Sequence, residues 1–222
     1  LHTGFGQSGR PSMGSWITYG LGSKNQDLPG FIVLNSGLIP PGGLDCFSNG
    51  FLPAAYQASI FKYGGRPIAN ITRTEPSAEL QQNKLKLLRQ LDQSVVDRIG
   101  RLDKIESAIA NQELAFRMQA AVPDLMDLKG ETEATKKMYG LDSKFRNTAT
   151  FGRNCLIARR LVERGVRFIE LTCTGGNGDR WDQHGGLKDG HTKNAKSVGQ
   201  GIAALLQDLD GRGLLDSTLL VW

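Results

Sequence analysis

The sequence predicts an α/β fold in which a mostly parallel sheet is flanked by helices and interrupted by a helical hairpin. Two observations carry this prediction. Helical and strand-like segments alternate with short glycine joints in the last third of the chain, which is typical of parallel α/β sheets. In the middle of the chain, apolar residues recur every three or four positions over a long stretch, which indicates helices and no strand.

Composition narrows the class of protein. The 222 residues are 39% hydrophobic and 22% charged, which fits one globular domain with a sizeable core. Three cysteines are too few for a disulfide framework or a four-thiolate zinc site. No apolar run reaches the roughly 20 residues that span a bilayer, so we expect no transmembrane segment. The net charge is +5, but the basic residues are interleaved with acids, so we expect no nucleic-acid partner.

The first stretch, residues 1–75, is rich in glycine and proline and should contain short elements. Residues 11–19 predict a helix that begins with a proline and is stopped by Gly20. Phe31–Leu34 is a four-residue apolar run between Gly30 and Asn35, which predicts a buried strand.

The second stretch, residues 77–122, is helical by periodicity. Gly100 divides it into a hairpin, and Pro123 is expected to close it. Two interpretations stay open: the hairpin packs on its own domain as an insertion, or it is an arm that binds a partner. The stripe that defines this face contains Leu88, Leu91, Val95, Ile99, Leu102, Ile105 and Ile109.

The third stretch should supply the second half of the sheet. We predict a helix from Asn147 or Thr148 to Arg164, a strand over residues 166–173 and a helix over about 191–210. Leu219–Trp222 is a short apolar run after a turn signal and predicts a further strand. Because such a strand would end the chain without a following loop, we expect an internal fragment, a partial domain truncated at both ends.

Chemistry is expected in the loop after the strand at 166–173, because ligands of open α/β sheets gather at the carboxyl ends of strands. If the chain is extended near residue 181, Asp182 and His184 point to the same side. His191 follows in the same loop, which also contains Asp179 and Asp189. A carboxylate with one or two imidazoles suits a divalent cation such as zinc or manganese; the alternative is a solvated surface loop.

Several long segments resemble a bacterial family catalogued as domain of unknown function fifteen-oh-one. The resemblance is typical of planctomycete proteins and covers the chain. The segments that carry it are residues 9–23, 25–34, 50–53, 155–168, 181–185 and 205–222. Relatives are usually exported with a twin-arginine signal, and their fold is similar to that of alkaline phosphatases and sulfatases. The resemblance therefore implies export to the periplasm or cell envelope in the full-length form.

The resemblance also implies a function. Asp182 with His184, and His191 beside them, would correspond to an aspartate–histidine metal pair, with zinc, manganese or calcium as the cofactor. The implied reaction is metal-dependent hydrolysis of a sulfate or phosphate ester, on a small molecule or a polysaccharide. No nucleophile is assigned within the chain, so we expect the fragment alone to be inactive.

A second interpretation stays open beside the enzyme. The chain would then be a non-catalytic exported module that binds sulfated polysaccharide or another partner in the cell envelope. Gly199 and Gly201 stand where relatives often carry aspartate and proline, and this substitution could indicate lost activity.

Overall fold

A sheet of three parallel strands forms the centre of the molecule. The computed structural model describes the chain except residues 1, 63–67, 69–73, 101–102 and 176–180, with backbone alone for residues 99 and 103–105. The strands are β1 (Phe31–Asn35), β2 (Ser59–Lys62) and β3 (Phe168–Leu171), in the spatial order β2-β1-β3. Both pairings are parallel. The predicted α/β class with a parallel sheet is confirmed.

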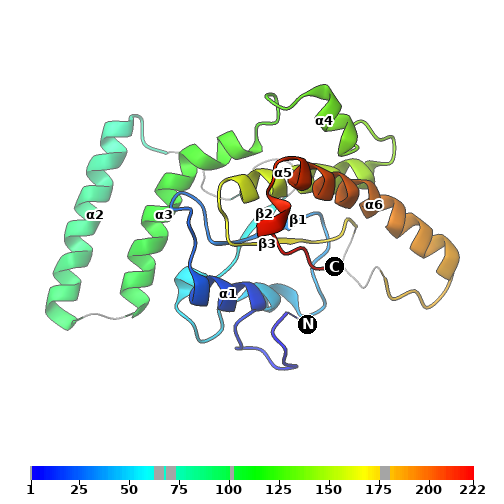
Figure 1. Ribbon diagram of the computed structural model, residues 1–222. Coiled ribbons are helices and arrows are strands. Elements are labelled where there is room, and N and C mark those ends of the chain that lie inside the picture. Colours follow the sequence, from blue (N-terminus) through cyan, green and yellow to red (C-terminus); the bar gives the residue numbers. More distant parts are fainter. Residues whose placement is uncertain (1, 63–67, 69–73, 101–102, 176–180) are drawn as a thin grey trace.

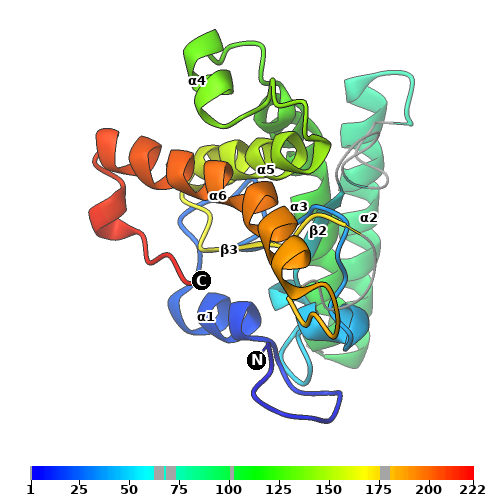
Figure 2. The ribbon, with the colours of Figure 1, turned by 90° about the vertical axis from the view of Figure 1, so that its right-hand side faces the viewer.

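Helices cover the two faces of this sheet (Figure 1). Turning the molecule shows α5 and α6 side by side over one face and α1 beneath the other (Figure 2). The helices are α1 (Met13–Leu21), α2 (Ala78–Ile99), α3 (Asp103–Met126), α4 (Glu133–Met138), α5 (Arg146–Glu163) and α6 (Leu187–Gly211). Three short 3-10 helices are η1 (Gly43–Phe47), η2 (Ala54–Tyr56) and η3 (Leu215–Ser217).

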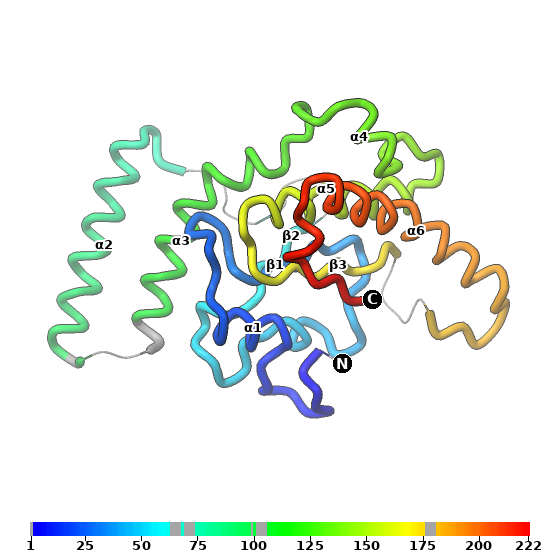
Figure 3. The backbone as a smooth tube through the Cα atoms, viewed as in Figure 1, coloured from blue at the N-terminus to red at the C-terminus, as the bar shows by residue number. Residues whose placement is uncertain are grey.

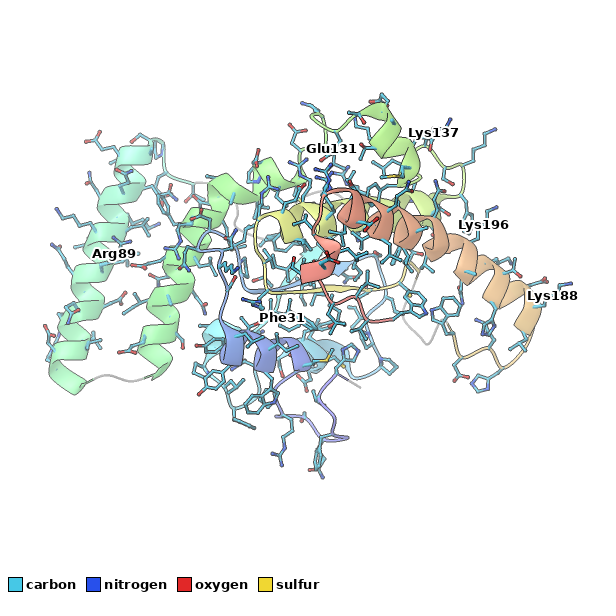
Figure 4. All side chains as sticks on the ribbon, in the orientation of Figure 1. Phe31, Arg89, Glu131, Lys137, Lys188 and Lys196 are labelled. Atoms are coloured by element: carbon cyan, nitrogen blue, oxygen red, sulfur yellow. The ribbon has the colours of Figure 1, made fainter. Side chains whose placement is uncertain are left out.

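Alternation along β1 divides the core between the two faces. Ile32 and Leu34 belong to the large apolar cluster with α3, α5 and α6, whereas Phe31 and Val33 face a smaller cluster on the opposite side. Figure 4 labels Phe31 at this position between the sheet and α1. The close approach of α1 depends on Gly14, because a Cβ there would lie 2.7 Å from the ring of Phe31. Burial on both faces explains why β1 is a continuous apolar run.

The predicted helices of the middle stretch are present as α2 and α3, which lie beside each other in Figure 3. Pro123 does not close this stretch, because α3 continues to Met126. The two helices differ in packing: Met118 and Val122 of α3 are buried in the core, and no described residue of α2 enters either apolar cluster. Leu102 of the predicted stripe lies outside the described residues, and the side chains of Ile99 and Ile105 are not described.

The interface between α5 and α6 contains a buried network of ion pairs. Arg159 is 3% exposed, and its guanidinium lies 2.6 Å from Glu131, 2.8 Å from Glu163 and 3.0 Å from Asp208. The contact to Asp208 is an ion pair of Nε that is not aligned as a hydrogen bond. Tyr139 donates to Asp208 at 3.0 Å. Glu131, labelled in Figure 4, therefore ties the segment before α4 to α5.

The predicted strand at Leu219–Trp222 is wrong. The segment is extended, but no hydrogen bond of its backbone to a described strand is present, and Leu219, Val221 and Trp222 are exposed. Only Leu220 packs against the core. An apolar run forms a strand only if a neighbouring strand pairs with it, and among the described strands β3 pairs with β1 alone.

Candidate metal-binding loop

The carboxyl ends of β1 and β3 meet in a set of buried polar side chains. The backbone N–H of Ser36 donates to Thr172 Oγ1 at 3.0 Å, and Thr172 in turn donates to Asn35 Oδ1 at 3.2 Å. Asn154 of α5 donates to Ser36 Oγ at 2.7 Å. These bonds satisfy the backbone and side chains where the strands end, so this set is a structural support for the loop that follows β3.

Gly37 lets the loop after β1 approach the loop after β3 closely. It forms an isolated bridge with Thr174, and a Cβ at Gly37 would lie 2.6 Å from the carbonyl oxygen of Gly175. Its φ of +125° is also a backbone conformation that favours glycine. The path of the chain after β3 is therefore fixed up to Gly175.

A narrow notch lies between the end of β3 and α6. It is lined by Cys173, Thr174, Trp181, Asn194, Ser197 and Val198. Thr174 is 2% exposed, and its hydroxyl has no hydrogen-bond partner among the described residues. A buried hydroxyl without a partner is uncommon in folded proteins. Thr174 Oγ1 is therefore a polar atom in the notch that is able to form a hydrogen bond with a bound molecule.

Asp182 and His184 come directly after Trp181, and the structure brings them together. His184 Nε2 lies 3.0 Å from Asp182 Oδ2. Both side chains are open to solvent, with 57% of Asp182 and 88% of His184 exposed. The expectation that the two point to the same side is confirmed.

His191 takes a different position on the second turn of α6. Its ring packs edge-on against Trp181, with 5.7 Å between the ring centroids, and its Nδ1 lies 3.0 Å from the carbonyl oxygen of Leu187. Trp181 also contacts Trp222 at 6.2 Å between centroids. Trp181 therefore lines the notch and also contacts His191 and Trp222.

The described residues contain no group of three or more His, Cys, Asp or Glu side chains that could hold a metal ion. The structure thus pairs Asp182 with His184 and does not gather His191 with them. Asp179 lies outside the described residues. One carboxylate and one imidazole are a partial ligand set for zinc or manganese, whose remaining positions can be taken by water or substrate oxygens.

Two of the three cysteines, Cys155 and Cys46, are disfavoured as nucleophiles. Burial raises the pKa of Cys155 far above its ordinary value, so its thiol stays protonated at neutral pH. Burial, assisted by the charge of Glu170, also raises the pKa of Cys46. Both effects disfavour the thiolate, which is the reactive form.

Sequence reasoning did not find Ser36, Asn154, Thr174 and Asn194. A usable signal existed for Ser36 and Thr174, because polar residues directly after a buried strand mark the carboxyl edge of a parallel sheet. Asn154 and Asn194 carried no comparable signal, since each lies within a helix and is brought to the edge by helix packing.

Comparison with known proteins gives a family but no characterised relative. The family model described as "Protein of unknown function (DUF1501)" matches residues 1–222. No curated protein and no solved structure matches the chain. Among the described residues no helix has the length and apolar character needed to cross a membrane.

Proposed function

The chain belongs to the DUF1501 family, and from that membership and the loop after β3 we propose that it contributes the metal-binding part of an ester hydrolase. The proposed substrates are sulfate or phosphate esters of small molecules or polysaccharides. The proposed fold relation is to alkaline phosphatases and sulfatases, which is consistent with helices on both faces of a parallel sheet. The proposed site of action is the periplasm or cell envelope.

One observation carries this proposal. Asp182 and His184 lie 3.0 Å apart, exposed, in the loop that follows a strand at the carboxyl edge of the sheet. Ligands of open α/β sheets bind at this edge. Because both side chains are exposed, the pair contributes little to the stability of the fold, and its atoms are accessible to a ligand at this edge.

The donor set fits a divalent cation. A carboxylate oxygen and an imidazole nitrogen are ligands that zinc and manganese accept, and calcium would use the carboxylate with more oxygens. A bound cation would polarise the ester oxygen and lower the pKa of attacking water. Hydrolysis then adds water across the ester: the bond from phosphorus or sulfur to the alcohol oxygen breaks, and the alcohol leaves with a proton.

His191 is a candidate third ligand in this proposal. If its Nδ1 carries the proton and donates to the Leu187 carbonyl at 3.0 Å, Nε2 is left as a possible ligand atom. Bringing Nε2 to the pair requires the loop around Trp181 to rearrange on metal binding. The proposal therefore predicts that metal changes the environment of Trp181.

The test is the metal content of residues 1–222 after equilibration with zinc or manganese and removal of free metal. We expect about one ion per chain in the parent, and loss of that ion in the double variant Asp182→Ala/His184→Ala. Asp189→Ala is the matched control, because Asp189 is an exposed carboxylate in the first turn of α6, close in sequence to the pair, and is not assigned as a ligand. A parent chain that holds no ion, or a double variant that retains it, contradicts the assignment.

Turnover is tested in the full-length gene product with aryl phosphates and aryl sulfates. Metal-dependent hydrolysis that is lost in Asp182→Ala/His184→Ala would support the enzyme. Metal binding without turnover of either ester class would contradict hydrolysis and favour a binding module.

A further inference from the structure

A row of exposed aromatic rings lies along α1, on the side of the sheet opposite α5 and α6. The centroid of the Trp16 ring lies 5.6 Å from that of Phe51 and 6.2 Å from that of Tyr19, and Tyr19 lies 5.2 Å from Tyr56. Phe51, Trp16 and Tyr19 are all exposed, Trp16 by 46%. A contiguous aromatic patch of this kind on a folded surface marks an interaction site.

A groove of about 320 Å³ begins at one end of this row. It is lined by Thr3, Gly4, Phe5, Arg10, Pro11, Trp16 and Phe51. Arg10 is the one charged residue in this lining; its guanidinium stacks over the ring of Phe5 at 5.0 Å and makes no ion pair with a described residue. The groove is therefore aromatic, with a single positive charge available for an anionic group.

The ring geometry favours one class of ligand. Neighbouring rings are inclined by 74°, 75° and 87° and contact each other edge to face, so the row presents corners beside these contacts and not a flat platform. A sugar ring stacks the broad C–H face of its chair best on a flat platform, whereas the compact ring of proline can pack into the corner between the face of one aromatic ring and the edge of the next. Aromatic-lined grooves that bind polyproline II segments are a recurring mode of peptide recognition.

Spacing and hydrogen bonding agree with such a segment. A polyproline II helix rises about 3.1 Å per residue, so each ring-to-ring step of the row corresponds to about two residues. Its carbonyl groups make no internal hydrogen bonds and need donors. The indole N–H of Trp16 and the hydroxyls of Tyr19 and Tyr56 make no hydrogen bond to another described residue, so they can supply those donors.

We propose that the surface formed by Phe51, Trp16, Tyr19 and Tyr56, together with the Arg10 groove, binds an extended proline-rich segment of a partner protein that carries an acidic residue at the Arg10 end. Prolines pack into the corners beside the ring contacts, and the carboxylate pairs with the guanidinium of Arg10. The proposal is independent of the metal-binding loop, which lies at the carboxyl edge of the sheet.

The test is fluorescence anisotropy with a labelled peptide of nine prolines followed by three glutamates, titrated with residues 1–222. We expect a dissociation constant in the micromolar range, typical of a small and weakly charged interface. Three comparison peptides replace the glutamates by lysines, replace the prolines by alternating glycine and serine, or make both changes. Each single change should weaken binding at least fivefold.

Variants separate the two parts of the surface. Trp16→Ala should weaken binding of the glutamate peptide at least tenfold, and Arg10→Ala should abolish the preference for glutamate over lysine while leaving the proline dependence. Leu80→Ala is the matched control, since Leu80 is an equally exposed apolar residue on α2. Circular dichroism melts verify that each variant is folded. We expect Trp16→Ala to fold, because the side chain of Trp16 is exposed.

Two outcomes would overturn the proposal. Equal affinity for the proline and glycine–serine peptides would show that the row does not recognise polyproline. Binding of a sulfated oligosaccharide that depends on Trp16, with no binding of the proline peptide, would assign the surface to a glycan. Neither outcome changes the metal content of the chain. Failure of the peptide-binding proposal can therefore be distinguished from failure of the proposed hydrolase.

Discussion

Two regions use similar residues in opposite ways: the interface between α5 and α6, and the loop over residues 181–186. At the interface, Arg159 is buried among three carboxylates and links three segments of the chain, namely α5, the segment before α4, and α6. In the loop, Asp182 and His184 contact each other and are exposed. The difference teaches that burial, more than residue type, distinguishes an ion pair that supports the fold from one that is open to solvent.

Removing the guanidinium of Arg159 is the strongest way to sharpen this contrast. Arg159→Ala leaves Glu131, Glu163 and Asp208 without their shared cation, and we expect the free energy of unfolding to fall by about 3–5 kcal/mol. Urea unfolding followed by circular dichroism measures it. Arg164→Ala is the control, because Arg164 pairs with exposed Asp124 and should cost less than about 1 kcal/mol. Equal losses in the two variants would break the contrast.

Two glycines of α6 provide the next test. A Cβ at Gly201 would lie 3.1 Å from Cys155 Sγ and 3.2 Å from the Cα of Gly152, so α5 and α6 would have to move apart by a few tenths of an ångström to admit alanine. We expect Gly201→Ala to lower stability by about 1–2 kcal/mol. A Cβ at Gly199 meets nothing within 4 Å, so Gly199→Ala should raise stability by up to about 1 kcal/mol. Thermal melts of both variants compare them, and a shift of the same sign would contradict the packing argument.

Alkaline pH should weaken the interface through Cys155. Because burial raises the pKa of this thiol, the folded chain keeps a proton that the unfolded chain loses above its ordinary pKa near 9.0. The contribution of this protonated thiol to the free energy of unfolding is complete below pH 9. Above pH 9 it falls by up to about 1.4 kcal/mol for each further pH unit. Urea melts from pH 7 to 10 should show a shallower decline in Cys155→Ala than in the parent. Parallel declines would mean that the thiol does not contribute.

The smallest effect is expected in the loop. With metal removed by a chelator, Asp182→Ala and His184→Ala should each change the free energy of unfolding by less than about 1 kcal/mol, because exposed pairs contribute little. Chemical denaturation without metal measures this. A loss as large as that of Arg159→Ala would show that the pair holds the fold and would remove the contrast between the two regions.

Sequence periodicity predicted what depends on local pattern. The predicted strand Phe31–Leu34 corresponds to β1. The bounds of the two helices predicted in the last third of the chain agree with those of α5 and α6 to within a few residues. β2 and α4 were not predicted, because Ser59–Lys62 alternates weakly and α4 is only six residues long. The strand at Leu219–Trp222 was predicted wrongly, since an apolar pattern does not reveal whether a partner strand lies beside it.

The candidate site was predictable in part for the same reason. Asp182 and His184 are two residues apart, so local chain geometry brings them together. The position of His191 against Trp181 and the burial of Thr174 depend on how α6 packs beside β3, which no local pattern encodes. The network of Arg159 was likewise invisible, because its partners come from segments far apart in the sequence.

The pairing of β1 with β3 has a consequence for how the chain folds. Ser36 and Thr172, hydrogen-bonded at the ends of these strands, are 136 residues apart in the sequence. Closing such a loop is slow, so this parallel pairing is expected to limit the folding rate. The entropy of closure grows only with the logarithm of loop length, by about 0.6 kcal/mol for each doubling. The α2–α3 hairpin lies within this loop, and its length could therefore change greatly at little cost to the sheet.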